Sequence, residues 1–326
     1  MTTPTFTPHP LLKKGYVQTV VAAVLPHIGR VERSQVEWVR LSDGDELRLD
    51  IDAPFGGLSK QPLVLLLHGT GGSGDDSLIV RQAQKFKALG YVAIRFHHRG
   101  CGDGAEQKVR GLYHAGRLSD LVDVLDYLNA KWPDRPCLII GYSLSGNMIL
   151  RLLGDSAYDG KNNIVAALAI CPPIVLETAS LALSAWRNSP IDYFMTARFV
   201  KKARRIEAKK PISLRRELPT VFRARELDEV YTSRVAGFNG RLAYYKACSA
   251  KDYLSAIEVP VSILCTEDDP IIPVAMFKTG IPQNVDLRIE GQGGHVAFID
   301  RNFTEFGDHR WLDTYVIDWV MSKSSF

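Results

Sequence analysis

The pattern that most constrains the fold of this chain is a series of short apolar runs separated by amphipathic segments. Such runs are typical of parallel strands buried on both faces of a sheet, and the segments between them are typical of crossover helices. We therefore expect an α/β fold with a mostly parallel central sheet and helices on both faces. The expected strands are residues 63–67, 92–96, 137–140, 164–170, 261–265 and 285–289, and the expected helices are residues 78–89, 117–128, 146–153 and 311–321, with a short helix near Met276.

Two further strands are expected before this series. Residues 35–41 and 46–51 alternate apolar and polar side chains on either side of Ser42-Asp43-Gly44-Asp45. Alternation around a central Asp-Gly pair indicates an antiparallel hairpin. We expect these antiparallel N-terminal strands to form one edge of the sheet.

One connection is far too long for an ordinary crossover. Almost ninety residues separate the strand ending near Cys171 from the strand starting near Val259. An insertion that leaves the carboxyl ends of parallel strands tends to cover the ligand site. We therefore divide the chain into an irregular N-terminal arm with a short apolar piece, a core, and a helical lid or cap insertion, which are residues 1–33, residues 34–171 with 257–326, and residues 172–256.

Composition places the chain among ordinary globular proteins. Its 326 residues are 46% apolar and 23% charged, which excludes disordered, collagen-like and disulfide-framework classes. The five cysteines are scattered without C-x-x-C spacing, which favours reduced thiols. The sequence has no signal-peptide pattern and no run of roughly 18 apolar residues, so we expect a cytoplasmic protein without a membrane span.

Positive charge is concentrated in one part of the insertion. Residues 198–225 hold eleven Lys or Arg and two Glu, although the formal net charge of the whole chain is only +4. Such a run is usually a solvated helix face, but it also allows weak contact with an anionic membrane surface or an acidic substrate. Aromatic residues suited to base stacking are sparse there, so we do not expect nucleic-acid binding. The oligomeric state is left open.

A strand, a tight turn and a helix meet at Gly141-Tyr142-Ser143-Leu144-Ser145. A G-x-S-x-small turn places its serine on a sharp corner, with the hydroxyl exposed and the next N–H directed at a developing oxyanion. The pentapeptide alone is also a common chance string, but the apolar strand before it and the apolar helix after it favour function. Ser143 is therefore the candidate nucleophile. Ser145 stands where glycine is more usual.

A serine nucleophile requires a base and an acid that orients the base. Gly293-Gly294-His295 follows the last predicted strand, which makes His295 the candidate base. Asp268 and Asp269 follow the strand before it. Only one of these adjacent side chains can reach His295; the spacing to the second proline of Asp269-Pro270-Ile271-Ile272-Pro273 favours Asp269, with Asp268 as the alternative acid. The resulting order, Ser, Asp, His, is that of α/β hydrolases.

Two backbone N–H groups are candidates for the oxyanion hole. Leu144 follows the nucleophile, and Thr70 lies in His68-Gly69-Thr70-Gly71-Gly72, directly after a predicted strand. This loop lacks the glycine pattern of a nucleotide site, and we expect His68 to fix it through hydrogen bonds. Residues 97–102, His-His-Arg-Gly-Cys-Gly, do not match zinc-ligand spacing, so we interpret them as a turn and expect neither metal nor cofactor.

Taken together, these motifs resemble the α/β-hydrolase superfamily and, within it, the YheT-like hydrolases related to animal abhydrolase-domain lipid and ester hydrolases. The matches run nearly end to end, and they are Gln18-Thr19, His68-Gly69, Arg99-Gly100-Cys101-Gly102, Gly141-Tyr142-Ser143-Leu144, Gly146-Asn147-Met148, Leu227-Asp228, Tyr244-Tyr245, Asp268-Asp269-Pro270 and Gly293-Gly294-His295. The resemblance implies hydrolysis of carboxylic esters, with acylglycerol or phospholipid substrates in some members, without a cofactor, by Ser143, Asp269 and His295. Ser145 departs from the family pattern.

The expected function is therefore a serine hydrolase that cleaves a small-molecule carboxylic ester, with a short-chain or lipid-like acyl group, through an acyl-enzyme. Two alternatives stay open. The same fold could serve as a binding protein or receptor with little turnover, or the enzyme could be a thioesterase or lactonase.

Overall fold

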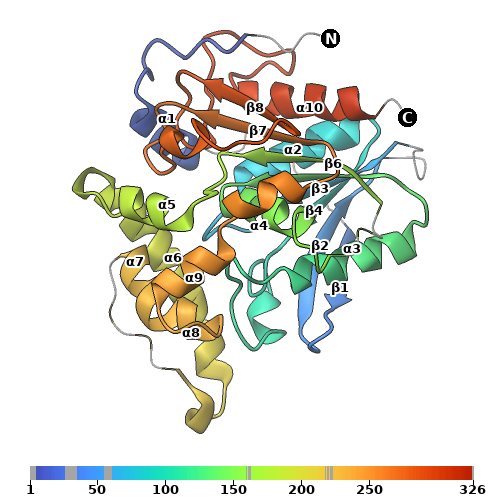
Figure 1. The fold of residues 1–326 in the computed structure, drawn as a ribbon. Helices are drawn as coiled ribbons and strands as arrows, with labels where there is room; N and C mark the ends of the chain where they lie inside the picture. The colour runs from blue at the N-terminus through green and yellow to red at the C-terminus, as the bar shows by residue number, and fades with distance from the viewer. Residues whose placement is uncertain are drawn as a thin grey trace.

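The computed structural model describes residues 5–25, 35–54 and 61–324, except 159, 161–162, 217, 219 and 221–222. Its centre is an eight-stranded sheet with the order β1-β2-β4-β3-β5-β6-β7-β8 (Figure 1). This sheet confirms the predicted fold class. The strands are β1 (Gln35–Arg40), β2 (Glu46–Asp52), β3 (Leu63–Leu67), β4 (Val92–Phe96), β5 (Cys137–Tyr142), β6 (Ile164–Ile170), β7 (Val261–Thr266) and β8 (Val285–Glu290).

Strand directions follow the predicted pattern. β1 pairs with β2, and β2 with β4, in antiparallel register, whereas the other five pairs are parallel. Leu67, at the end of β3, pairs with Phe96 of β4 and with Gly141 of β5. The carboxyl ends of these strands therefore meet along one edge of the sheet, where ligands of such folds bind.

Two hydrophobic layers cover the parallel strands, because successive side chains of a strand point to opposite faces. Val64 and Leu66 of β3 pack in the layer that contains α2 (Ser77–Ala88) and α10 (Trp311–Lys323). Leu65 and Leu67 pack in the layer that contains α3 (Ser119–Lys131) and α4 (Leu144–Leu153). The central strand is thus fully buried and fixes the loops at its end.

The N-terminal arm differs from the expected irregular segment. Residues Gly15–Val24 form a helix, α1, whose Gln18 and Thr19 are buried. The expected apolar piece, residues 16–25, forms this helix up to Val24, and Leu25 follows the last helical residue. Residues 1–4 and 26–33 of the arm lie outside the described residues. The arm therefore contributes a packed element, whose contacts are described below.

Residues 172–256, which we call the cap segment, contain no strand among the residues that are described. Figure 1 shows its α-helices grouped on one side of the sheet. Asn188 joins the cap segment to the loop after β7, since its Nδ2 donates to the carbonyl oxygen of Pro270. The elements are α5 (Leu176–Leu183), η2 (Trp186–Asn188), α6 (Ser189–Lys209), η3 (Ile212–Leu214), α7 (Ala224–Leu227), η4 (Asp228–Thr232), α8 (Ser233–Val235), α9 (Arg241–Cys248) and η5 (Lys251–Ala256).

The remaining short helices are η1 (Ala105–Gln107) and η6 (Val274–Phe277), the second at the position expected near Met276. Across the described ranges, every helix is too short or too polar to span a bilayer. All five cysteines are buried and free.

Candidate active site

Ser143 occupies a sharp corner between β5 and α4. Its backbone has φ 54° and ψ −119°, a conformation that residues other than glycine rarely adopt. The corner is closely packed: a Cβ atom on Gly141 would lie 2.4 Å from Cδ1 of Ile149. A glycine is therefore required two positions before the serine, as expected for a nucleophile elbow.

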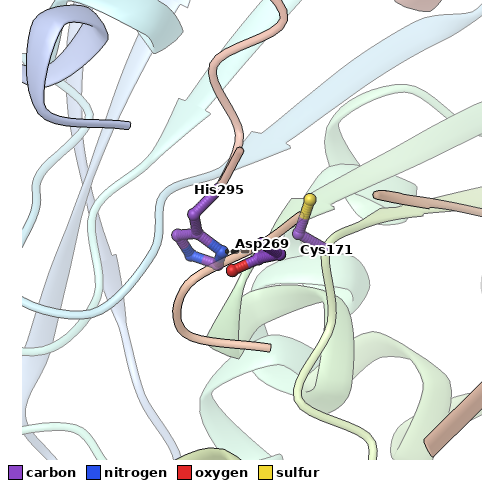
Figure 2. Close-up of side chains that lie close together, drawn as sticks. All are labelled: Cys171, Asp269 and His295. Atoms are coloured by element: carbon purple, nitrogen blue, oxygen red, sulfur yellow. Dashed lines mark hydrogen bonds and ion pairs between the residues drawn. The ribbon is translucent and has the colours of Figure 1, made fainter. Parts of the chain in front are cut away.

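His295 connects Ser143 to Asp269. Its Nε2 lies 2.9 Å from the Ser143 Oγ, and its Nδ1 lies 2.8 Å from Oδ2 of Asp269. A carboxylate only accepts, so Nδ1 carries the proton and Nε2 is free to accept from the serine hydroxyl. Figure 2 shows the imidazole directed at Asp269. The three side chains thus form one hydrogen-bonded chain.

The structure distinguishes the two adjacent aspartates. Oδ1 of Asp269 accepts the N–H groups of Ile271 and Ile272, both across 2.8 Å, which leaves Oδ2 for the histidine. Asp268 instead accepts the N–H of Gly294 across 2.9 Å. Burial raises the pKa of Asp268. Asp268 therefore fixes the loop that carries His295, whereas Asp269 contacts the imidazole.

Helix α1 supports the same loop from the other side. The N–H of His295 donates to Oγ1 of Thr19 across 2.8 Å, and this hydroxyl donates to the carbonyl oxygen of Gly15 across 2.7 Å. A Cβ atom on Gly294 would lie 2.3 Å from that carbonyl oxygen. The arm therefore positions the histidine backbone, a role that sequence reasoning missed although Gln18-Thr19 belonged to the matched motifs.

The loop after β3 approaches the elbow closely. A Cβ atom on Gly69 would lie 3.2 Å from Cβ of Ser143. Thr70 and Leu144 line the same cavity as Ser143, and neither backbone N–H has an acceptor among the described residues. The loop is held by Gly71, whose N–H donates to the Tyr113 hydroxyl across 2.7 Å. Two candidate oxyanion donors thus flank the serine.

Ser145 has a defined role in this arrangement. It is fully buried, and its hydroxyl donates to the carbonyl oxygen of His68. Since that proton is used, Nε2 of His98 must donate to the Ser145 Oγ, 2.6 Å away. Burial lowers the pKa of His98 to about 3, so this imidazole is neutral near pH 7. The serine that replaces the usual glycine therefore ties the elbow to two neighbouring loops.

His68 fixes these loops through hydrogen bonds. Its Nε2 accepts the N–H of His98 across 3.2 Å, so Nδ1 carries the proton that is directed to the carbonyl oxygen of Gly69, 2.8 Å away. Burial lowers the pKa of His68 well below its ordinary value. A buried neutral imidazole with both nitrogens engaged is suited to holding a loop rather than to proton transfer.

Residues 97–102 form a turn in which the side chains of His97, His98 and Cys101 contact different partners. His97 contacts Asp50 through Nε2 at 3.2 Å, whereas His98 contacts Ser145. Cys101 lies 3.2 Å from Nζ of Lys202. In the described ranges two groups bring metal-ligand atoms close together: Asp50 and Asp75 with His97 of this turn, and Cys171 with Asp269 and His295. Arg48 and Arg95 already pair with Asp50.

Figure 2 places Cys171 beside Asp269 and His295. Cys171 directly follows β6 and has φ 48°. Asp269 and Ser143 already bond to both nitrogens of His295. We therefore interpret Cys171, Asp269 and His295 as part of the hydrogen-bonded chain with a neighbouring thiol, rather than as a metal site. Sequence reasoning missed this neighbour, although its position at a strand end was a usable signal.

An apolar cavity of about 130 Å³ opens at Ser143. Its lining residues come from both the core and the cap segment. Its apolar lining includes Leu144, Leu176, Ala179, Leu183, Met195, Phe199, Leu227, Ile271 and Ile272. Asp228, Thr232 and Tyr245 also line it, and sequence reasoning assigned no site role to these three. The arrangement can hold an apolar group beside a serine hydroxyl that has a base within reach.

The sheet order and the strand-end positions of Ser143, Asp269 and His295 define an α/β hydrolase. Residues 64–308 match the model of the alpha/beta hydrolase family, so the chain belongs to that family, as the motifs predicted. It is 29% identical to YheT of Escherichia coli (strain K12), described by its name as a proposed esterase, over 94% of this chain and 91% of YheT.

A second relative is abhydrolase domain-containing protein 2 of Drosophila melanogaster, with 24% identity over 94% of this chain and 81% of that protein. Among solved structures, the Pyrococcus furiosus esterase Pf2001 has a TM-score of 0.53 and 16% identity, covering 91% of this chain and 95% of that one. The structural likeness supports the fold.

Proposed function

We propose that the protein is a serine hydrolase that cleaves carboxylic esters through an acyl-enzyme. The observation that carries this proposal is the hydrogen-bonded chain from Ser143 through His295 to Asp269, which opens into an apolar cavity. A serine hydroxyl is a weak nucleophile unless an oriented base removes its proton. The tautomer fixed by Asp269 provides that base.

In the proposed mechanism the Ser143 Oγ attacks the ester carbonyl carbon while Nε2 of His295 takes its proton. The tetrahedral intermediate collapses, and the imidazolium returns the proton to the departing alkoxide, so that an alcohol leaves. Water then attacks the acyl-enzyme by the same route and releases the acid. Asp269 stays ionised and stabilises the imidazolium in both steps.

The N–H groups of Thr70 and Leu144 would stabilise the oxyanion. Both flank Ser143, and neither is used elsewhere within the described structure. Donors that are held in place before reaction stabilise the developing charge without reorganisation. The bonds from Ser145 to His68 and from Gly71 to Tyr113 supply that rigidity on the Thr70 side.

The cavity favours an apolar acyl or alcohol group, short-chain or lipid-like. Its walls are mainly aliphatic and aromatic side chains, which gain free energy by removing apolar substrate surface from water.

We further propose a weak contact between the cap segment and an anionic membrane surface. Leu181 of α5, Trp186 of η2 and Phe194 of α6 are exposed, and α5 and α6 also contribute residues to the cavity lining. Arg187 and Arg198 are exposed beside them. Apolar side chains flanked by cations suit an anionic lipid surface.

The proposed activity is tested with chromogenic esters of increasing acyl length, together with matched thioesters and lactones. Ser143→Ala should lower kcat for the best substrate by at least about a thousandfold. Ser119→Ala, which changes an exposed serine at the start of α3, should leave kcat unchanged. Full activity in Ser143→Ala would refute the mechanism, and a folded wild-type protein that turns over none of these substrates would indicate the binding-protein alternative.

A further inference from the structure

We propose that the cavity beside Ser143 contains a polar subsite, centred on Asp228, that binds a hydrogen-bond donor of the substrate, a hydroxyl or a protonated amine. The proposal rests on the proposed function, since it assigns part of the same cavity to the substrate. It goes further by predicting a polar group on an otherwise apolar substrate.

The hydrogen bonds around Asp228 leave one of its carboxylate oxygens able to accept a hydrogen bond from a ligand in the cavity. The Tyr245 hydroxyl donates to Oδ2 of Asp228 across 2.7 Å, and the Ser180 hydroxyl lies 2.9 Å from the Tyr245 oxygen. Since Tyr245 has used its proton, Ser180 is the donor in that second bond. Within the described structure no hydrogen bond reaches Oδ1 of Asp228. One carboxylate oxygen is thus fixed, and the other is available.

Thr232 provides a second polar atom at the same place. The residue is 5% exposed and lines the cavity, and its Oγ1 has no hydrogen-bond partner among the described residues. The hydroxyl lies close enough to the Asp228 carboxyl to lower its pKa, against the larger effect of burial, so the two polar groups face the same part of the cavity. Buried hydroxyls are normally paired. A ligand that donates to Asp228 could also pair with Thr232.

The charge of Asp228 is not neutralised by a cation. In the described ranges no Lys or Arg forms an ion pair with it, and Arg241, the nearby cation, pairs with Glu229 at 2.7 Å. Asp192 is a second carboxyl nearby, with Nη1 of Arg223 3.7 Å from its Oδ2, and burial raises the pKa of Asp228. A half-buried carboxylate without a cation costs free energy of folding. Such a cost is characteristic of a group kept for binding.

The chemistry of the ligand follows from these charges. A hydroxyl or ammonium group can donate to Oδ1 of Asp228, and an ammonium group would also compensate the negative charge. A carboxylate or phosphate would be repelled by Asp228, which has no cation paired with it. We therefore exclude an anionic group at this position, even though the outer surface of the cap segment is basic.

The test compares chromogenic esters that differ only at the end of the acyl chain: methyl, hydroxyl, amino or carboxylate, with four to twelve carbons. A second series carries the same groups on the alcohol half, because either half could occupy the cavity. We expect the wild-type protein to hydrolyse the hydroxyl or amino member with a kcat/KM at least about tenfold above the methyl member in one series. The comparison of hydroxyl with amine identifies the donor.

Asp228→Asn provides the sharper test. The asparagine oxygen can keep the bond from Tyr245, which turns the amide NH₂ toward the cavity where an acceptor stood. The donor preference should fall about tenfold, and the carboxylate esters should improve relative to the methyl esters. Glu226→Gln, which removes an exposed carboxylate of α7, should preserve the wild-type selectivity.

A purely structural role of Asp228 would change stability without changing selectivity. Equal donor preference in wild type and Asp228→Asn, or no preference in either wild-type series, would overturn the subsite while leaving the proposed function intact. If no ester is hydrolysed, thermal shifts of Ser143→Ala with linear diols and matched mono-alcohols still decide the question. A larger shift with the diols supports the subsite, and equal shifts refute it.

Discussion

The Ser145 hydroxyl donates a hydrogen bond to the carbonyl oxygen of His68 across 2.5 Å and accepts one from His98. This contact joins the first turn of α4 to the loop that carries Thr70. The elbow and the second oxyanion donor are therefore held by one side chain, at the position where a glycine is more usual.

Ser145→Ala or Ser145→Gly should lower kcat about tenfold or more, with little change in KM. Without the hydroxyl, the His68 carbonyl loses its donor and the Thr70 N–H is less well fixed, which weakens binding of the transition state more than of the ester. Steady-state kinetics, normalised by active-site titration, separate this effect from partial unfolding. Wild-type kcat in Ser145→Gly would mean that the serine only fills space.

Thr19→Val should lower kcat and destabilise the fold by about 1–2 kcal/mol, because an isosteric side chain leaves the His295 N–H without its acceptor. Thr19→Ser keeps the hydroxyl and should restore both. Kinetics and chemical denaturation measure the two effects. If Thr19→Val and Thr19→Ser behave alike, helix α1 does not position the histidine.

Asp228→Asn should stabilise the protein by about 1–3 kcal/mol at pH 8, and the gain should vanish below pH 4. Burial raises the pKa of Asp228 to about 6, above its ordinary value of 3.8. The folded state therefore binds the proton more tightly than the unfolded state, so the wild type loses stability as the pH rises from about 4 to 6.

The groups that face Asp228 are Tyr245, Thr232, Asp192 and Arg241, and the substitution leaves them unchanged. Urea denaturation at several pH values measures the effect, with Glu226→Gln as the control. A variant less stable than wild type at pH 8 would contradict the assignment of an uncompensated carboxylate.

Trp186→Ser combined with Phe194→Ser should reduce flotation with phosphatidylglycerol vesicles, and high salt should reduce flotation of the wild type. Phe303→Ser removes an exposed aromatic ring outside the cap segment and is the matched control. Equal flotation with neutral and anionic vesicles, independent of salt, would refute the proposed surface contact.

The sheet could be predicted because each strand and turn is specified by the residues of its own short segment. The apolar runs of β3, β4 and β5 are buried on both faces, and the Asp43-Gly44 turn, with Gly44 at φ 90°, defines the edge hairpin. Placing Ser143 and His295 required only strand ends and chain order. These features need no knowledge of distant contacts.

The remaining features depend on contacts that sequence spacing does not encode. Asp268 and Asp269 are adjacent and chemically alike, and only the three-dimensional loop directs one to His295. Thr19 is 276 positions from the histidine that it supports. Asp228 follows no strand, and its relation to Ser143 arises from the folding of the cap segment over the core.

The most direct test of the account is mass spectrometry of the folded protein after treatment with a fluorophosphonate. The account predicts rapid labelling at a single residue, Ser143, which is lost in Ser143→Ala and slowed in His295→Ala, because the base activates the serine. Absence of labelling in the folded wild-type protein, or labelling that persists in Ser143→Ala, would contradict it.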